Sequence, residues 1–551
     1  MKKIITTCIF AVLFLLPSCL DVDPPGRYGD DQVWESSRNL DFNIKSFYYD
    51  VLHHGYVSEI SSPSILTDAF GDLLKYTRYQ DGNSANRFFS TTNFMSEENT
   101  LSPWSDWYTR IKKLNDFLIA VNEGNGNKLD PEELNQRVGE VRFLRAFLYQ
   151  DLTIRHGGVV LRVNETRLDG PDEAQKARST KEECWDFIID EYEKSAGLLP
   201  ENWSEYGRLT KGAAWGMMAR AALYAGRWDK AIEAAGKVEE LAADGYYELL
   251  EDYGKIFTVP DNKELIIPVY YSLNNGHAFD QTACPSGDQS VFGTIYIGGL
   301  VSPTDEFAGS YDIKVNGIWR TFNWDDVKNG SIADPWADRD IRFYHTILHN
   351  GAEWRGRELE LYVNGADGFL QYSETGNESM RKSVTGYVIR KFLSTDVDYQ
   401  SVNKSKEYWI EMRYAEILLI LSEAHARKGD MSAAYEYLNK IRRRAQLSDL
   451  SQKPNWEGYL NDLQKERICE LGLEGHRFWD LRRWGIATDV LNGSRTHGIK
   501  ITKNGNNFSY ERVDADEKDR VFPEKYNIFP IPSTEVRRNI LCTQDDIWKN
   551  S

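Results

Sequence analysis

Apolar side chains return every three or four residues through most of the chain. In the stretch 411–445, for example, Tyr414, Ile417 and Leu421 fall on one face of a helix. Similar spacing predicts helices over 33–52, 104–121, 137–154, 181–199, 211–241 and 456–484. We therefore expect a mainly α-helical fold.

The stretch 411–445 has the pattern of a helical hairpin. Gly429 suits the left-handed residue that ends a first helix, and Asp430 suits the cap of the second. This pattern resembles one tetratricopeptide unit, which buries its apolar face only by stacking on neighbours. A second hairpin of this kind spans 221–235, so the repeats are dispersed along the chain.

The helical period fades between about residues 246 and 392. Gly, Asn and Asp become frequent there, and only short strand-like runs occur, at 265–271 and 387–389. We expect one domain over 31–551, in which a helical scaffold (31–245 and 405–551) carries a loop-rich, ligand-binding insertion (246–404). A further polar insertion spans 498–521.

The N-terminus carries an export signal. Lys2 and Lys3 precede an apolar run over 4–16 that is too short to span a bilayer. The run ends at Cys19 in Leu-Pro-Ser-Cys, which resembles a lipobox in which the cysteine is acylated. We expect a signal peptide over 1–18 and a lipid-anchored tether over 19–30. An ordinary cleaved signal peptide is the alternative.

The acidic residues Asp21 and Asp23 follow the cysteine and resemble a surface-export signal of some diderm bacteria. This resemblance indicates attachment to the outer membrane, facing outwards. The formal net charge of the chain is -18 and no basic stripe is present, so nucleic acid is not an expected partner. The cysteines do not have the spacing of a zinc site. The sequence allows one disulfide among Cys184, Cys284, Cys469 and Cys542 but does not identify the pair.

Acidic residues gather in 470–480, which contains Glu470, Glu474, His476 and Asp480. Such a group has the chemistry of a metal site or of an acid/base pair, but several arginines interleave with it. We interpret it as a charge network that joins helices. The chain has no HExxH or GxSxG motif, and we expect no enzymatic activity.

Three aspartates in 334–340 offer oxygen ligands suited to calcium: Asp334, Asp338 and Asp340. They lack the EF-hand pattern, and arginines lie among them. Local ion pairs are the favoured interpretation, and a structural calcium ion is the alternative. No other cofactor is expected.

Two clusters of aromatic residues lie in polar, loop-like sequence, the first from Tyr76 onwards and the second from Tyr296 onwards. A flat aromatic ring can stack on the C–H face of a sugar while neighbouring polar side chains orient the hydroxyl groups. The alternative for each ring is a place in the core, and Trp104 in particular has a helical spacing that fits packing. The candidate ligand-binding residues are Asp72, Tyr76, Arg78, Tyr79, Trp104, Trp107, Tyr296, Trp319, Trp324 and Trp336.

Several motifs, in order along the chain, resemble the SusD/RagB family of surface glycan-binding lipoproteins. Residues 139–146 read GEVRFLRA, and residues 413–416 read RYAE. The most specific stretch, 474–485, reads EGHRFWDLRRWG, and 529–532 reads FPIP near the C-terminus. The resemblance covers nearly the whole mature chain.

The resemblance implies a helical fold with four tetratricopeptide-like units and no catalysis. It also implies pairing with a SusC-like TonB-dependent outer-membrane transporter and a sugar platform on loops of the two aromatic regions. We therefore expect a lipoprotein that captures an oligosaccharide and passes it on. Three alternatives stay open: a lid for peptide cargo, a surface glycoside hydrolase, and a structural subunit without a ligand.

Overall fold

The structure is a computed structural model. It describes residues 30–63, 66–77, 85–90, 101–164, 175–290, 298–374, 382–395 and 405–549. Cys19, the signal peptide and the tether up to residue 29 lie outside the described residues.

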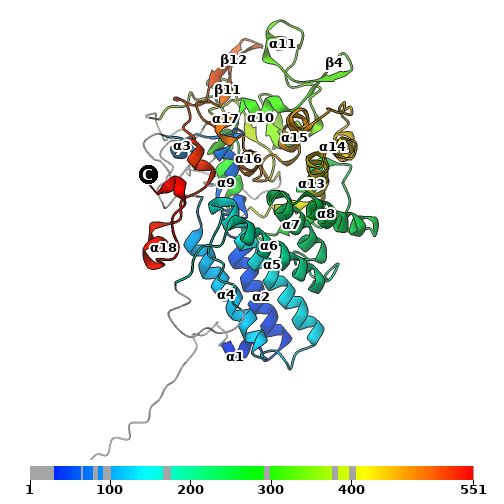
Figure 1. The fold of residues 1–551 in the computed structure, drawn as a ribbon. Coiled ribbons are helices and arrows are strands. Elements are labelled where there is room, and N and C mark those ends of the chain that lie inside the picture. The colour runs from blue at the N-terminus through cyan, green and yellow to red at the C-terminus, as the bar shows by residue number, and fades with distance from the viewer. Residues whose placement is uncertain are drawn as a thin grey trace, which may run out of the picture.

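Long helices build the first half of the described chain, as the apolar spacing predicts (Figure 1). They are α2 (Ser37–Leu52), α4 (Trp104–Asn122), α5 (Pro131–His156), α6 (Lys181–Leu198), α7 (Lys211–Tyr224) and α8 (Trp228–Ala243). Asp130 caps α5, because its carboxylate accepts the backbone N–H groups of Glu132 and Glu133 at 3.0 Å each. Neighbouring helices pack in chain order from α4 to α8.

The second helical block comprises α13 (Tyr414–Arg427), α14 (Met431–Arg444), α15 (Trp456–Leu471) and α16 (Arg477–Arg483). The Asp430 carboxylate accepts the Ala433 N–H at 3.1 Å, as expected of the cap of α14. Helix α13 packs on both α7 and α8, and the Tyr437 hydroxyl donates to Glu239 at 2.9 Å. The two dispersed hairpins are therefore neighbours in space, and the mainly α fold with tetratricopeptide-like hairpins is confirmed.

The remaining helices are short. They are α1 (Asp30–Val33), α3 (Ala85–Phe88), α9 (Phe279–Ala283), α10 (Asp305–Ser310), α11 (Trp324–Lys328), α12 (Ile341–Thr346), α17 (Ala487–Leu491) and α18 (Ser533–Arg538).

Every strand pair in the described residues is antiparallel and two-stranded. The pairs are β1 (Leu74–Tyr76) with β3 (Val301–Pro303), β2 (Leu265–Val269) with β10 (Trp409–Arg413), β4 (Ile313–Val315) with β5 (Ile318–Arg320), β6 (Ile347–Leu348) with β9 (Val388–Ile389), β7 (Glu353–Trp354) with β8 (Arg357–Glu358), and β11 (His497–Asn504) with β12 (Asn507–Asp514). Strands β2 and β9 confirm the strand-like runs in the insertion.

Two predicted segments differ in the structure. Residues 411–413 belong to strand β10 instead of the first helix of the hairpin, because they pair with β2. The polar insertion 498–521 contains the β11–β12 hairpin. Ile499 and Ile501 point inwards from β11 and are fully buried, whereas most of β12 is exposed. One buried face is enough to fix the register of this hairpin.

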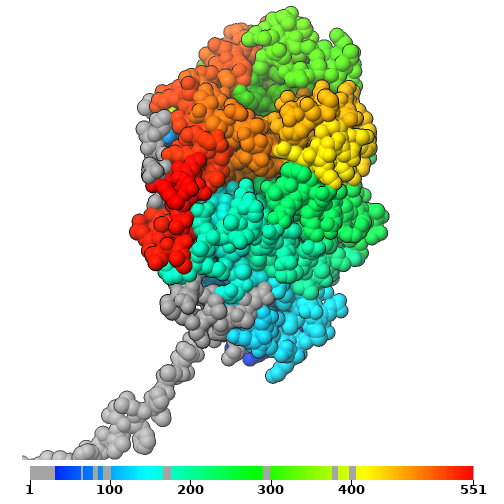
Figure 2. All heavy atoms as spheres, in the orientation of Figure 1, coloured from blue at the N-terminus to red at the C-terminus, as the bar shows by residue number. Residues whose placement is uncertain are grey.

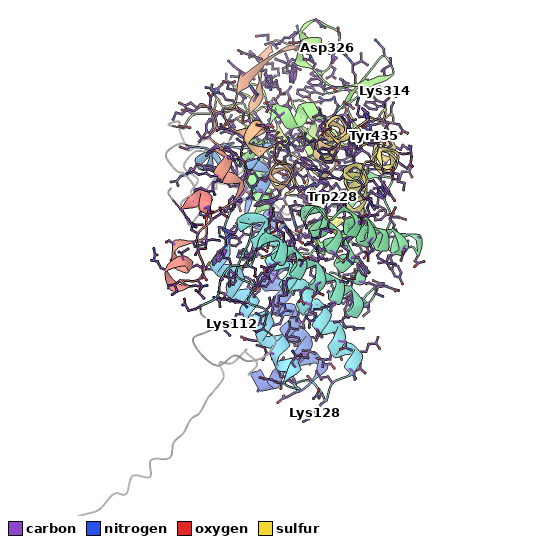
Figure 3. The ribbon with its side chains drawn as sticks, viewed as in Figure 1. Lys112, Lys128, Trp228, Lys314, Asp326 and Tyr435 are labelled. Atoms are coloured by element: carbon purple, nitrogen blue, oxygen red, sulfur yellow. The ribbon has the colours of Figure 1, made fainter. Side chains whose placement is uncertain are left out.

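Strand β4, helix α11 and the β11–β12 hairpin lie at one end of the molecule, called here the insertion end, and α1 with the α4–α5 turn lies at the other (Figure 1). Lys314 and Asp326 mark the first end, and Lys128 marks the second (Figure 3). The C-terminal residues lie on the side of the early helices (Figure 2), where the Phe529 N–H donates to the Arg155 carbonyl at 2.8 Å.

Within the described part of the chain, no helix combines the length and apolar character needed to cross a membrane. The cysteines at 184, 284, 469 and 542 are all buried free thiols, so the disulfide left open by the sequence is not formed among them.

Candidate ligand-binding surface

The first predicted aromatic cluster is mostly core. Trp104 and Trp107 occupy the first turn of α4, where both rings are buried, and Tyr76 is buried in β1. The Trp107 indole N–H donates to Asp151, and the Tyr76 hydroxyl donates to the Pro63 carbonyl at 2.7 Å. These rings have no open face for a sugar, which corrects their assignment to a ligand platform.

Of the polar residues predicted to bind ligand beside that cluster, the structure describes Asp72. Both carboxylate oxygens of Asp72 accept the Arg477 guanidinium at 2.8 Å, which fixes helix α16 against the N-terminal segment. Asp72 is thus a structural ion-pair partner. Arg78, Tyr79 and Tyr296 lie outside the described residues.

In the second cluster, Trp324 and Trp336 form a layer beneath the β11–β12 hairpin. Both rings are buried, and the Trp324 indole N–H donates to Asp305 at 2.8 Å. Tyr510 of β12 packs on Trp324 with ring centroids 5.2 Å apart. Trp336 stacks in parallel on His349 at 4.9 Å. Both tryptophans support the surface instead of forming it, which again corrects the prediction.

Trp319 differs from the other described candidate aromatics because its ring is only partly buried. It lies on β5, in a hairpin that projects from the insertion end of the molecule (Figures 1 and 3). The Lys314 ammonium group is 5.5 Å from the ring centroid, and the indole N–H donates to the Gln446 carbonyl at 3.1 Å. The neighbouring Ile318 is 70% exposed. The hairpin therefore presents apolar and polar groups to solvent together.

The β11–β12 hairpin adds aromatic residues that the sequence reasoning missed. Phe508 is exposed, and its ring centroid is 5.9 Å from that of Tyr362 in the insertion. The Lys503 ammonium group is 4.7 Å from the Tyr362 ring centroid. The alternation of Phe508 and Tyr510 in a polar stretch is the signal that would have indicated this strand.

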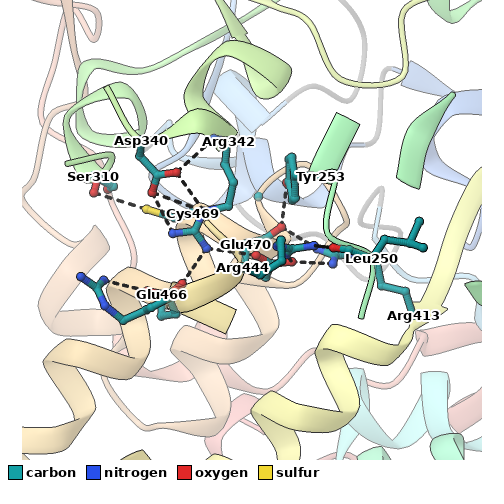
Figure 4. Close-up of polar contacts among 12 residues, drawn as sticks. Leu250, Tyr253, Ser310, Asp340, Arg342, Arg413, Arg444, Glu466, Cys469 and Glu470 are labelled. Atoms are coloured by element: carbon teal, nitrogen blue, oxygen red, sulfur yellow. Dashed lines mark hydrogen bonds and ion pairs between the residues drawn. The ribbon is translucent and has the colours of Figure 1, made fainter. Parts of the chain in front are cut away.

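Arg413 joins three buried carboxylates, of which Glu470 is labelled in Figure 4. Its guanidinium donates to Glu264 at 2.7 Å, to Glu470 at 2.6 Å and to Glu474 at 2.8 Å. Burial alone would raise the pKa of the Glu470 carboxyl, but the guanidinium groups of Arg444, Arg413 and Arg342 hold that pKa well below its usual range.

Asp480 belongs to a second set of ion pairs, with Arg467 at 2.7 Å and Arg483 at 2.8 Å. Burial opposes ionisation, yet these two arginines lower the pKa of Asp480 to about 2. Burial lowers the pKa of His476 to about 4, so this imidazole is neutral at pH 7. The predicted charge network is confirmed.

Two of the three aspartates considered for calcium, Asp334 and Asp340, are engaged locally. Asp340 binds Arg342 at 2.8 Å, and an Asp334 oxygen accepts the Trp336 N–H at 2.9 Å. Among the described residues, no group of three or more His, Cys, Asp or Glu side chains has the arrangement of a metal site.

These features define a class: a scaffold of helical hairpins that carries, at one end, a β-hairpin with the partly buried Trp319. A family model described as the SusD family matches residues 263–551, and a second, described as "Starch-binding associating with outer membrane", matches residues 55–223. The chain belongs to the SusD family.

The similarity to individual family members extends over most of the chain. SusD-like protein P2 of Formosa agariphila is 22% identical over 507 residues, which cover 89% of this chain and 92% of that protein. A SusD-like protein of Bacteroides fragilis has the same fold with a TM-score of 0.78 and 25% identity, over 94% of this chain and 98% of that one. A SusD-like carbohydrate-binding protein of the same species gives a TM-score of 0.74 and 24% identity, over 92% and 99%.

Proposed function

We propose that this protein is an outer-membrane lipoprotein that binds an oligosaccharide at the cell surface and passes it, uncleaved, to a SusC-like TonB-dependent transporter. The observation that carries the proposal is the partly exposed ring of Trp319 on a projecting hairpin, beside Lys314 and the exposed Ile318. An aromatic face with adjacent polar groups suits the C–H face and the hydroxyl groups of a sugar.

Membership of the SusD family supports carbohydrate as the ligand class. One matching family model is described as starch-binding, and one similar structure is described as carbohydrate-binding. The exposed Phe508 of β12, which packs on the partly buried Tyr362, adds an aromatic group at the same end of the molecule.

A binding role is favoured over hydrolysis because the clustered carboxylates are held by arginines. A glycoside hydrolase needs two carboxyl groups facing a substrate, one of them able to donate a proton. Glu466, Glu470 and Asp480 are instead buried in ion pairs. The lipobox at Cys19 supports a lipid anchor, and the description "associating with outer membrane" supports its place.

Affinity gel electrophoresis against a panel of neutral and acidic polysaccharides tests this function. We expect retardation by at least one polysaccharide, with calorimetry on the matching oligosaccharide giving one binding isotherm and a reducing-sugar assay giving no product. Product release would identify a hydrolase. Binding of peptides without binding of any glycan would identify peptide cargo, and either result contradicts the proposal.

A further inference from the structure

A polar cavity of about 70 Å³ lies deep in the molecule, away from the insertion end. Its walls come from α5, α7, β10, the segment 474–476 and α16, so both helical blocks contribute. The partly buried Tyr56, Ile154 and Tyr224 belong to its lining, which gives the cavity access to the surface. Trp107 reaches it only indirectly, through its hydrogen bond to the lining residue Asp151.

Polar groups without partners converge on this cavity. The side chain of Gln150 is 4% exposed, and its carbonyl oxygen accepts no hydrogen bond within the described chain. A buried polar group left without a partner costs about 1–3 kcal/mol. The indole N–H of Trp479 and the hydroxyl of Tyr224 also have no hydrogen bond to a described residue, but these two atoms are not fully buried and can reach an occupant of the cavity. One buried acceptor and two accessible donors around one space indicate a polar occupant.

The charges around the cavity are compensated. Arg155 pairs with Asp151, and Arg220 pairs with Glu416 at 2.7 Å as well as with Glu411. An anion would meet these carboxylates and a cation would meet these guanidinium groups. A neutral occupant avoids both.

Two further titratable groups of the lining, Glu59 and His476, are uncharged at pH 7. Burial, reinforced by the charge of Asp68, raises the pKa of the Glu59 carboxyl to about 8. Burial lowers the pKa of His476 to about 4. Glu474, the other acid in the lining, is paired with Arg413 and Lys391. The lining thus offers donors and acceptors without a net charge that would select an ion.

The rest of the lining is aromatic and apolar. The rings of Trp409, Trp479, Tyr56, Tyr224 and Phe147 all contribute to the walls. Aromatic and apolar walls bind the C–H groups of an organic molecule more favourably than they bind water. A volume of about 70 Å³ holds roughly two waters at about 30 Å³ each, or a short chain of carbon and oxygen atoms.

We propose that this cavity binds the hydroxyl-bearing end of a neutral polyol. The occupant is either a free small polyol or the terminal arm of a saccharide whose ring stays at the mouth beside Tyr56 and Tyr224. The saccharide source rests on the proposed function, whereas the cavity chemistry does not. The site is separate from Trp319, which lies on the projecting hairpin at the insertion end.

Calorimetry on the full chain with glycerol and with maltose tests this site. The variants Gln150→Leu, Trp479→Phe and Tyr224→Phe each remove one unpartnered polar group and keep most of the side-chain volume. We expect each to weaken binding at least about tenfold, as expected for a lost hydrogen bond of about 1.4 kcal/mol, with an unchanged or higher Tm of the free protein.

Tyr311→Phe is the matched control. The Tyr311 hydroxyl is also buried and has no partner in the described residues, but Tyr311 does not line the cavity. We expect this variant to bind both probes normally. Binding of glycerol identifies a free polyol as ligand, and binding of maltose alone identifies the saccharide arm.

Absence of binding by either probe, or equal binding by all variants, overturns the proposal and leaves only water in the cavity. The proposed function fails by a different result. It fails if no polysaccharide retards the wild-type protein, even where glycerol binds in the cavity; loss of retardation in Trp319→Ala with intact binding in the cavity shows that the two sites are separate.

Discussion

The guanidinium of Arg413 donates to both the side-chain carboxylate and the main-chain carbonyl oxygen of Glu470, each at 2.6 Å. This double contact joins the end of strand β10 to helix α15. Because β10 also pairs with β2 of the insertion and Arg413 binds Glu264 there, one buried cation connects the second helical block with the insertion.

Replacing Arg413 with Met removes the cation and leaves Glu264, Glu470 and Glu474 buried without their common partner. Breaking a buried ion pair from one side costs about 3–5 kcal/mol. We expect a loss of at least this size in the free energy of unfolding, measured by urea denaturation.

Arg443→Met is the matched control for that loss. Arg443 lies in the last turn of α14 and pairs with Glu436 and Asp449, but it is exposed. Exposed pairs contribute about 0–1 kcal/mol, so this variant should unfold close to the wild type. Equal effects of the two substitutions would contradict the assigned role of Arg413.

Stability should fall between pH 5 and pH 8 because of Glu59. Burial, with the charge of Asp68, raises the pKa of its carboxyl from 4.5 to about 8 in the folded state. Over this range the unfolded chain has released the proton and the folded chain keeps it, so stability decreases as pH rises, by up to about 1.4 kcal/mol per pH unit.

The variant Glu59→Gln should show a flatter decline, because its amide stays neutral and can still accept the Thr67 N–H. Denaturant unfolding of both proteins at pH 5, 6, 7 and 8 measures the difference in slope. Parallel pH curves would show that Glu59 ionises normally in the folded protein.

Trp107→Ala should act on stability, in contrast to Trp319→Ala. Trp107 is fully buried and its indole N–H is bound by Asp151, so truncation leaves a cavity and an unpaired carboxylate oxygen. We expect a loss of about 3–5 kcal/mol in unfolding free energy for Trp107→Ala and less than about 1 kcal/mol for Trp319→Ala. Thermal unfolding of the two variants checks this, and the reverse order would restore Trp107 as a platform candidate.

Lipid anchoring depends on one thiol. Cys19→Ser should abolish incorporation of labelled palmitate and release the protein from the membrane fraction, because the cysteine sulfur carries the lipid. Cys184→Ala, which changes a buried free thiol, should keep both the label and the fraction. A wild type without label would support the ordinary signal peptide, and labelling that persists in Cys19→Ser would contradict lipid attachment at this sulfur.

The sequence predicted the scaffold well because helix signals are local. Asp430 caps its helix as expected, and the interleaved Arg467 and Arg483 neutralise Asp480. The arginines that neutralise Glu470 come instead from other parts of the chain. The family motifs fall on these same elements. The periodicity of apolar residues could not predict that two hairpins far apart in the sequence stack on each other, because this stacking depends on contacts between α13 and α8.

The aromatic site was harder to predict, because the presence of aromatic residues in a stretch of sequence does not show whether their side chains are exposed to solvent. Trp324 and Trp336 occur in polar sequence, yet the β11–β12 hairpin from a distant part of the chain covers them through Tyr510. Trp319 stays partly exposed because it lies on a two-stranded projection. Burial of this kind is set by long-range packing, which no short window of sequence contains.

The central claim is that an aromatic surface at the insertion end binds glycan. The most direct measurement compares polysaccharide retardation of the wild type with that of Trp319→Ala in affinity gels. Tyr246→Ala, which removes an exposed aromatic residue that follows α8, serves as the control. The account predicts that Trp319→Ala loses retardation while Tyr246→Ala keeps it. Full retardation of Trp319→Ala by a polysaccharide that retards the wild type would contradict the claim.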